Sequence, residues 1–195
     1  MANRRALFLA ATGFEDIEYA ATRDILRRAG IETVTADCRL EPSSAPILGR
    51  EKLEIVDKVL LRDVDLSAFD ILVIPGGGHY QILERNPLVI AAIQYFAARA
   101  DKYLCCICAA PTILGHLGLL KGRDYTCFPT MDEKAFQGRF HLDYSVIDGH
   151  LVTGQGPAAS IQFGLAIVKA VLGREACLEV GRHMFFKGIE ELAGE

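Results

Sequence analysis

Residues 5–37 read RALFLAATGFEDIEYAATRDILRRAGIETVTAD. Residues 5–11 are almost continuously apolar, a pattern typical of a strand that is buried on both faces of a parallel sheet. Apolar residues then recur at every fourth position as far as Gly30, which predicts a helix whose core-facing side carries Ile17, Ala21, Ile25 and Ala29. Residues 31–37 supply a second strand, so the whole stretch predicts a βαβ unit.

The rest of the chain continues this alternation. Buried strands are expected at residues 71–74 and 103–107, and a β-hairpin around Asp148-Gly149. Further helices are expected to begin at Pro87, Ala109 and Pro157, the last of them burying Ile161, Leu165, Val168 and Leu172. No repeat or linker interrupts the pattern. Residues 1–195 are therefore predicted to form a single α/β domain around a mostly parallel sheet.

Composition and charge exclude several classes of protein. The chain has 195 residues, 51% of them hydrophobic, and its 21 Lys+Arg against 25 Asp+Glu give a net charge of −4. Stable binding to nucleic acid or to an anionic membrane needs clustered positive charge, which this balance does not favour. No apolar run approaches the roughly 18 residues of a membrane-spanning helix, and the apolar start is too short for a signal peptide. We expect a cytoplasmic protein whose six cysteines are thiols.

Cys108 lies where the strand at 103–107 passes directly into a helix. Sites in such sheets form beyond the carboxyl ends of strands, and the small residues after Cys108 favour a tight turn that exposes a nucleophile. The start of the helix is expected to lower the pKa of the thiol. Amides of the glycine run 75–78 and of the new helix are expected to form an oxyanion hole. The alternative is that Cys108 is a buried small hydrophobic residue, as most free cysteines are.

The other cysteines are interpreted as packing residues. Cys105 and Cys108 have the spacing of a dithiol motif, but Cys105 lies within a strand, whereas that motif needs both sulfurs at the start of a helix. Neither the cysteines nor the five histidines show the paired spacing of a metal site. His79 follows the glycine run and is expected to be an exposed loop residue.

Acidic residues open the first helix. Glu18 is expected to project over the edge of the sheet toward Cys108, where partial burial would raise its pKa and suit it to proton transfer. Glu15 and Asp16 are interpreted only as acids that favour the start of a helix.

These motifs together resemble the ThiJ/PfpI superfamily, in the branch of the Parkinson's-linked DJ protein and bacterial YajL. The resemblance rests on five segments that cover nearly the whole chain: residues 15–18, 27–31, 75–77, 107–111 and 156–160. It implies a flavodoxin-like three-layer sandwich that works without metal or organic cofactor, as a homodimer. By position it implies Cys108 as nucleophile, Glu18 as its carboxyl partner, and the amides of Gly77 and Ala109 around the sulfur. It also implies that Arg28 and Arg50 lie near the dimer interface and the pocket.

Two departures from the family pattern reduce the number of activities that the resemblance implies. Relatives that act as peptidases or amidotransferases have a histidine after the cysteine, and here Ala109 occupies that position, so peptidase activity is not expected. Part of the DJ branch has a histidine before a proline near the pocket, where this chain has Phe128 before Pro129. Glu18 is then the only evident acid–base group.

The resemblance implies a cysteine enzyme of deglycase or glyoxalase type in the response to oxidative and carbonyl stress. Its substrates would be glyoxal, methylglyoxal, or their early adducts with protein and nucleotide groups. The alternative is a redox-sensing chaperone in which Cys108 is oxidised instead of turning over substrate.

Overall fold

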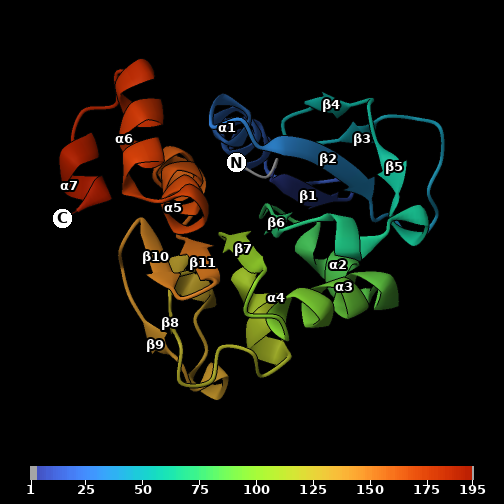
Figure 1. The fold of residues 1–195 in the computed structure, drawn as a ribbon. Helices are drawn as coiled ribbons and strands as arrows, with labels where there is room; N and C mark the ends of the chain where they lie inside the picture. The colour runs from blue at the N-terminus through green and yellow to red at the C-terminus, as the bar shows by residue number, and fades with distance from the viewer. Residues whose placement is uncertain (1–3, 195) are drawn as a thin grey trace.

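The computed structural model describes residues 4–194 and is built around a seven-stranded sheet (Figure 1). The strand order is β10-β11-β7-β6-β1-β2-β5, and every pair is parallel except the hairpin β10–β11. The strands are β1 (Arg5–Ala10), β2 (Glu32–Asp37), β5 (Val59–Leu60), β6 (Ile71–Ile74), β7 (Tyr103–Ile107), β10 (Ser145–Asp148) and β11 (Leu151–Gly154). Two small sheets flank it, formed by β3 (Ile47–Leu48) with β4 (Glu54–Ile55) and by β8 (Asp124–Tyr125) with β9 (Arg139–Phe140). The predicted α/β fold with a mostly parallel sheet is confirmed.

Helices cover both faces of the sheet, so the domain has three layers (Figure 1). One layer holds α1 (Asp16–Arg28), α5 (Ser160–Leu172), α6 (Arg174–His183) and α7 (Ile189–Ala193), and the other holds α2 (Tyr80–Arg85), α3 (Pro87–Ala97) and α4 (Pro111–His116). Short 3-10 turns complete the chain: η1 (Leu61–Asp63), η2 (Leu66–Ala68), η3 (Pro129–Met131), η4 (Lys134–Phe136) and η5 (Pro157–Ala159).

The position of strand β1 between two helical layers explains why apolar and polar residues do not alternate in its sequence. Ala6, Phe8 and Ala10 belong to the core under α1 and α5, whereas Leu7 and Leu9 belong to the core under α2 and α3. Successive side chains point to opposite faces of a strand, so a strand between two helical layers needs apolar residues at every position.

The predicted core face of α1 is partly wrong. Ile17 is 57% exposed, and the buried residues are Glu18, Tyr19, Thr22, Ile25 and Leu26. Of the predicted residues, Ile25 is buried and Ala29 packs against the core. Because a repeat of four residues advances about 40° around a helix of 3.6 residues per turn, Ile17 lies about 80° from Ile25 and leaves its face. Ile161 at the start of α5 is likewise exposed, not buried as predicted.

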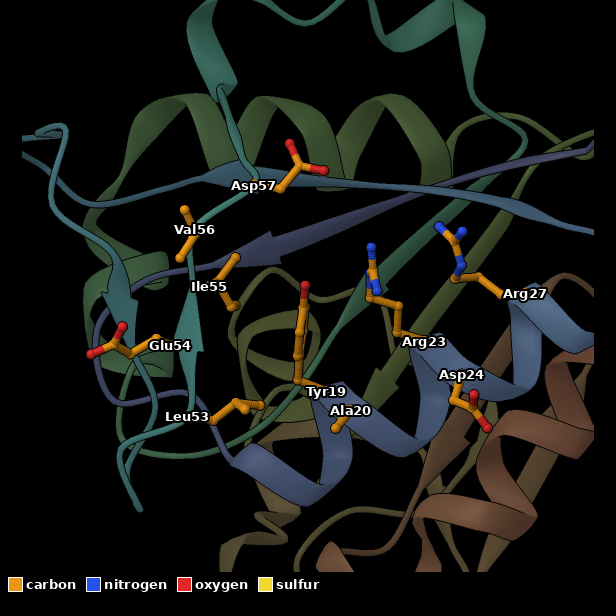
Figure 2. Close-up of a pocket in the computed structure, with 10 residues that line it drawn as sticks. All are labelled: Tyr19, Ala20, Arg23, Asp24, Arg27, Leu53, Glu54, Ile55, Val56 and Asp57. Carbon is orange, nitrogen blue, oxygen red and sulfur yellow. The ribbon is translucent and has the colours of Figure 1, made fainter.

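The solvent side of α1 borders a cavity of about 440 Å³ between this helix and residues 53–57 (Figure 2). Tyr19, Arg23 and Arg27 line it from the helix, and Leu53 and Val56 line it from the opposite segment. Neither Cys108 nor Glu18 contributes to this cavity.

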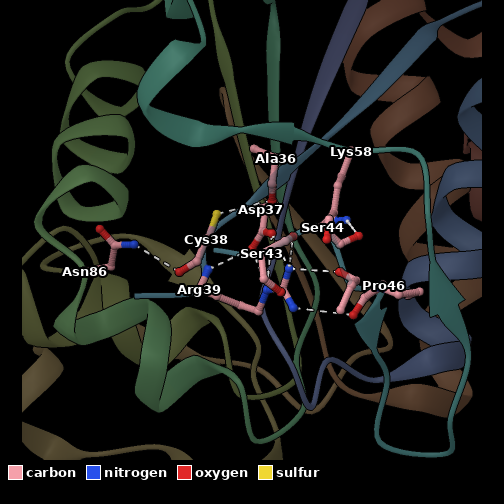
Figure 3. A network of polar contacts seen from close by, with 10 residues as sticks. Ala36, Asp37, Cys38, Arg39, Ser43, Ser44, Pro46, Lys58 and Asn86 are labelled. Carbon is pink, nitrogen blue, oxygen red and sulfur yellow. Dashed lines mark hydrogen bonds and ion pairs between the residues drawn. The ribbon is translucent and has the colours of Figure 1, made fainter. Parts of the chain in front are cut away.

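The loop after β2 is ordered by one arginine (Figure 3). Arg39 pairs with the buried carboxylate of Asp37 at 2.7 Å and donates to the carbonyls of Ser43 at 2.9 Å and Ala45 at 3.0 Å. These bonds satisfy carbonyl groups that no strand or helix pairs, so the loop has a defined path.

Among residues 4–194, no helix has the length and apolarity to cross a bilayer.

Candidate active site

Cys108 sits on a strained turn between β7 and α4. Its φ is +64°, a left-handed conformation that is uncommon for residues with a side chain. Two hydrogen bonds hold it there: its N–H donates to the Gly154 carbonyl at 2.9 Å, and its carbonyl accepts from the Phe128 N–H at 2.9 Å. The strained backbone is therefore fixed by β11 on one side and by the segment after β8 on the other, and the side chain keeps 9% exposure.

Glu18 meets Cys108 around Gly76. The Gly76 N–H donates to Glu18 Oε2 at 2.6 Å. A Cβ placed on Gly76 would lie 2.6 Å from Cys108 Cβ, 2.7 Å from Glu18 Oε2 and 2.9 Å from the Ile107 carbonyl oxygen. Only a glycine leaves room for the carboxyl and the thiol on the same side of this loop, so β6, β7 and α1 converge here as expected.

Burial dominates the electrostatics of the pair. It raises the pKa of Glu18 to about 7, against the lowering effects of the Gly76 amide and the Cys108 thiol. Burial, the charge of Glu18 and a hydrogen bond to Glu18 raise the pKa of the Cys108 thiol, while the amides of Ala109 and Gly77 lower it. The prediction that the start of a helix lowers this pKa is wrong. The helix that follows, α4, has only six residues and begins at Pro111, three positions after the cysteine.

These shifts define what the pair can do. Above pH 7 the carboxyl is ionised while the thiol keeps its proton, so Glu18 can act as the base that accepts this proton when sulfur attacks. Glu18 Oε1 is buried and has no hydrogen-bond partner among the described residues, which leaves this oxygen available for the proton.

Some of the remaining predicted site residues lie beside Cys108, and others lie away from it. The amides of Gly77 and Ala109 both face the Cys108 sulfur, and Phe128 contacts the elbow through its backbone. Arg50 lies near Glu15, whose pKa it lowers against the larger raising effect of burial. Arg28 is at the opposite end of α1, paired with Asp24 at 2.6 Å, roughly 15 Å along the helix from Glu18. Arg28 is therefore not part of the pocket.

Comparison with known proteins identifies the family. The model of the DJ-1/PfpI family matches residues 4–170. This chain belongs to the DJ-1/PfpI family. It is 33% identical over 175 residues to Protein DJ-1 homolog B of Arabidopsis thaliana, covering 88% of this chain but only 39% of that relative. The chain thus spans about two fifths of the Arabidopsis protein.

Two other known proteins align with this chain over most of their own length. The chain is 32% identical over 163 residues to the Glutathione-independent glyoxalase DJR-1.2 of Caenorhabditis elegans, covering 83% of this chain and 84% of the relative. The crystal structure of a cysteine-to-alanine mutant of a DJ-1 superfamily protein from Salmonella typhimurium superposes with a TM-score of 0.85 at 32% identity, covering 94% and 98% of the two chains. The flavodoxin-like architecture of the DJ-1/PfpI family is therefore also that of this chain.

The prediction that His79 is an exposed loop residue is wrong. His79 is fully buried: its Nδ1 accepts from the Ala11 N–H at 3.1 Å, and its Nε2 must then donate to the Pro75 carbonyl at 2.8 Å. Burial lowers its pKa to about 4, so the ring is neutral. His79 ties the ends of β1 and β6 together, and because both nitrogens are occupied it cannot serve as a base for Cys108. Its place directly after the glycine run was the only signal in the sequence.

The other cysteines lie inside the core. Cys38, Cys105, Cys106, Cys127 and Cys177 are all free and fully buried, in keeping with a packing role. Within residues 4–194 no group of three or more His, Cys, Asp or Glu side chains is arranged to hold a metal ion.

Gly76 supplies a direct test of this packing in the DJ-1/PfpI site. Gly76→Ala is expected to destabilise the fold by about 1–3 kcal/mol, because the new methyl group overlaps Cys108, Glu18 and a backbone carbonyl at once. Gly78→Ala is the matched control, since nothing lies within 4 Å of a Cβ at that position. Urea unfolding measures both. Equal stability of the two variants would contradict the described packing.

Proposed function

We propose that this chain is a cofactor-independent cysteine enzyme that converts glyoxal and methylglyoxal, or their early adducts with protein and nucleotide groups, into 2-hydroxy acids. The observation that carries the proposal is the contact of a buried carboxyl, whose pKa is about 7, with a thiol on a strained elbow. The name of the Caenorhabditis elegans relative, a glutathione-independent glyoxalase, supports the same reaction class.

The first step is addition of sulfur to the aldehyde carbon. Cys108 Sγ forms a bond to this carbon, the thiol proton passes to Glu18, and the carbonyl oxygen becomes an oxyanion that the amides of Gly77 and Ala109 face. Glu18 passes the thiol proton on to this oxygen, which completes a hemithioacetal and leaves the carboxylate ionised for the next step.

The second step moves hydrogen between the two adjacent carbons. Glu18 removes the proton from the former aldehyde carbon and returns it to the neighbouring carbon, while the hydroxyl proton on the first carbon passes to the oxygen of the second. The first carbon is thereby oxidised to a thioester and the second is reduced to an alcohol. Water then cleaves the thioester, which releases lactate from methylglyoxal and restores the thiol. With an amine adduct, Cys108 Sγ instead displaces the amine from the hemiaminal carbon: the C–S bond forms, the C–N bond breaks, and the thiol proton passes through Glu18 to the leaving amine. The resulting hemithioacetal then follows the second step.

The test is formation of lactate from methylglyoxal without glutathione, measured by enantiomer-resolved chromatography. Release of free amine from a methylglyoxal–lysine adduct, with methylglyoxal itself removed by a scavenger, separates deglycation from glyoxalase action. Absence of both products from the wild-type protein would overturn the proposal.

The pH dependence follows from Glu18. Because the carboxyl must be ionised to accept the thiol proton, kcat/KM is expected to fall about tenfold per pH unit below an apparent pKa of about 7. Initial rates between pH 5 and pH 8.5 measure this. A flat profile through pH 7 would show that Glu18 is not the base.

A redox-sensing chaperone is the second candidate. Cys108 is the one cysteine in the described part of the chain with measurable exposure, 9% against zero for the others. Peroxide would oxidise it first to a sulfenate and then, with a second peroxide, to a sulfinate. Selective gain of two oxygens at Cys108 by mass spectrometry, together with negligible dicarbonyl turnover, would favour this function.

The proposed setting is a homodimer in the reducing cytoplasm. Apolar side chains are exposed on elements that border the site, namely Ile17 on α1, Ile161 on α5 and Phe128 after β8. Light scattering coupled to gel filtration distinguishes a dimer from a monomer.

A further inference from the structure

Three short segments form a hydrogen-bonded ladder beside Cys108. The outer segment is residues 48–50, the middle one is residues 13–15, and the inner one is the glycine loop at residues 76–77. The outer segment is joined to the middle one by bonds of 2.8 Å from the Gly13 N–H to the Leu48 carbonyl and from the Arg50 N–H to the Phe14 carbonyl. The middle segment is joined to the glycine loop by the Glu15 N–H, which donates to the Gly76 carbonyl at 2.8 Å, and by a bridge between Phe14 and Gly77. The inner edge of this ladder carries the Gly77 amide that faces the sulfur.

The inner two segments are in very close contact. Gly77 has a φ of +92°, and a Cβ on it would lie 2.5 Å from both the Glu15 nitrogen and the Gly13 oxygen. Contacts this close leave no slack, so a displacement of residues 13–15 must also displace Gly77.

Asp16 clamps the outer edge of the ladder. Its Oδ2 accepts from the Glu51 N–H at 2.9 Å and its Oδ1 from the Leu53 N–H at 2.7 Å. A Cβ on Gly49 would lie 2.5 Å from Oδ2 and 2.6 Å from Oδ1, so the turn 49–53 wraps tightly around the carboxylate. These partners are 35 and 37 residues away in sequence, which an acid that only favours the start of α1 does not require.

The turn depends on this carboxylate. Lys52 has a φ of +76°, a conformation that costs free energy in a lysine and that its surroundings must impose. The internal bonds of the turn are from the Gly49 N–H to the Leu53 carbonyl at 2.8 Å and from the Lys52 N–H to the Gly49 carbonyl at 3.2 Å. Without Asp16, the amides of Glu51 and Leu53 lose their acceptors, and the turn loses its side-chain anchor while Leu48 and Arg50 keep their backbone bonds to residues 13 and 14.

We propose that Asp16 is a positioning residue for the active site, which holds the turn 49–53 and, through the ladder, keeps the Gly77 amide against the Cys108 sulfur. The consequence for catalysis rests on the proposed function. The placement of the amide does not, because it can be followed through the reactivity of the thiol alone.

The experiment compares Asp16→Asn with Asp65→Asn in the full chain. Asp65 is a matched control, since its Oδ1 also accepts two hydrogen bonds within a turn, from the Ser67 N–H at 2.9 Å and the Ser67 hydroxyl at 2.7 Å. Asp65 comes before the amino end of β6, whereas Gly76 follows the carboxyl end of the same strand. Asp16→Asn should lower kcat for methylglyoxal about tenfold with little change in KM, because a misplaced oxyanion donor acts on the transition state.

The second readout is alkylation of Cys108 by iodoacetamide across pH. Displacement of an amide that stabilises the thiolate should lower the alkylation rate at pH 8 roughly fivefold in Asp16→Asn and leave it unchanged in Asp65→Asn. Gly49→Ala, which presses a methyl group against the same carboxylate, should reproduce both effects and decides the matter if Asp16→Asn does not fold. Wild-type alkylation in Asp16→Asn and Gly49→Ala would overturn the proposal. If the wild-type protein does not turn over methylglyoxal, only the proposed function is overturned.

Discussion

Replacement of Cys108 by serine is expected to lower lactate formation from methylglyoxal by at least about 1000-fold. The pKa of a serine hydroxyl lies far above that of a thiol, and Glu18, whose pKa is about 7, is too weak a base to remove its proton. The backbone geometry should persist, because both hydrogen bonds that hold residue 108 come from backbone groups. The measurement is the single-turnover rate with excess enzyme, which separates chemistry from product release.

Cys127→Ser is the matched control for this variant. Cys127 is fully buried, follows β8, and its thiol donates to the neighbouring Phe128 carbonyl at 3.4 Å, a bond that a hydroxyl can replace. Turnover should remain within about twofold of wild type, since the sulfur of Cys127 takes no part in the proposed steps. Comparable loss in both variants would mean that the effect of Cys108→Ser is one of folding and not of chemistry.

Replacement of Glu18 by glutamine is expected to abolish turnover and at the same time to stabilise the protein at alkaline pH. The folded-state pKa of about 7 lies above the ordinary value of 4.5, so the folded state binds the proton more tightly than the unfolded state. The stability that this proton contributes is complete below pH 4.5 and is lost as the pH rises through 7. The difference amounts to about 3 kcal/mol.

Glutamine is neutral at every pH and can still accept the Gly76 N–H. Glu18→Gln should therefore match wild type near pH 4.5 and exceed its free energy of unfolding by up to about 3 kcal/mol at pH 8. Urea unfolding at the two pH values measures this, and Glu179→Gln on the exposed side of α6 is the control for removal of one carboxylate. A difference between Glu18→Gln and wild type that does not change with pH would refute the raised pKa.

The layers and the elbow were predictable from local patterns. Continuous apolar strands such as β1 require helices on both faces, and the passage of 103–107 directly into small residues predicts the turn at Cys108. The convergence of Glu18, the glycine loop and Cys108 follows from the general rule that the carboxyl ends of parallel strands share one edge. These features depend on residues that are close together in the chain or on the topology of the fold class.

Other features depend on atoms that are distant in sequence. His79 is buried because the Ala11 N–H supplies a donor and the Pro75 carbonyl supplies an acceptor, the two partners that a neutral ring needs, and neither partner has a recognisable pattern. Asp16 binds amides of Glu51 and Leu53, and backbone amides carry no sequence signal at all.

Local sequence thus accounts for the strands, the helices and the choice of Cys108 and Glu18 as the proposed reacting groups, because hydrophobic periodicity and turn chemistry are properties of neighbouring residues. The protonation of those groups followed only from how completely the folded chain excludes water. Burial raised the pKa of Cys108 where position at a helix start had suggested the opposite, since desolvation of a thiolate outweighs the dipole of a helix as short as α4.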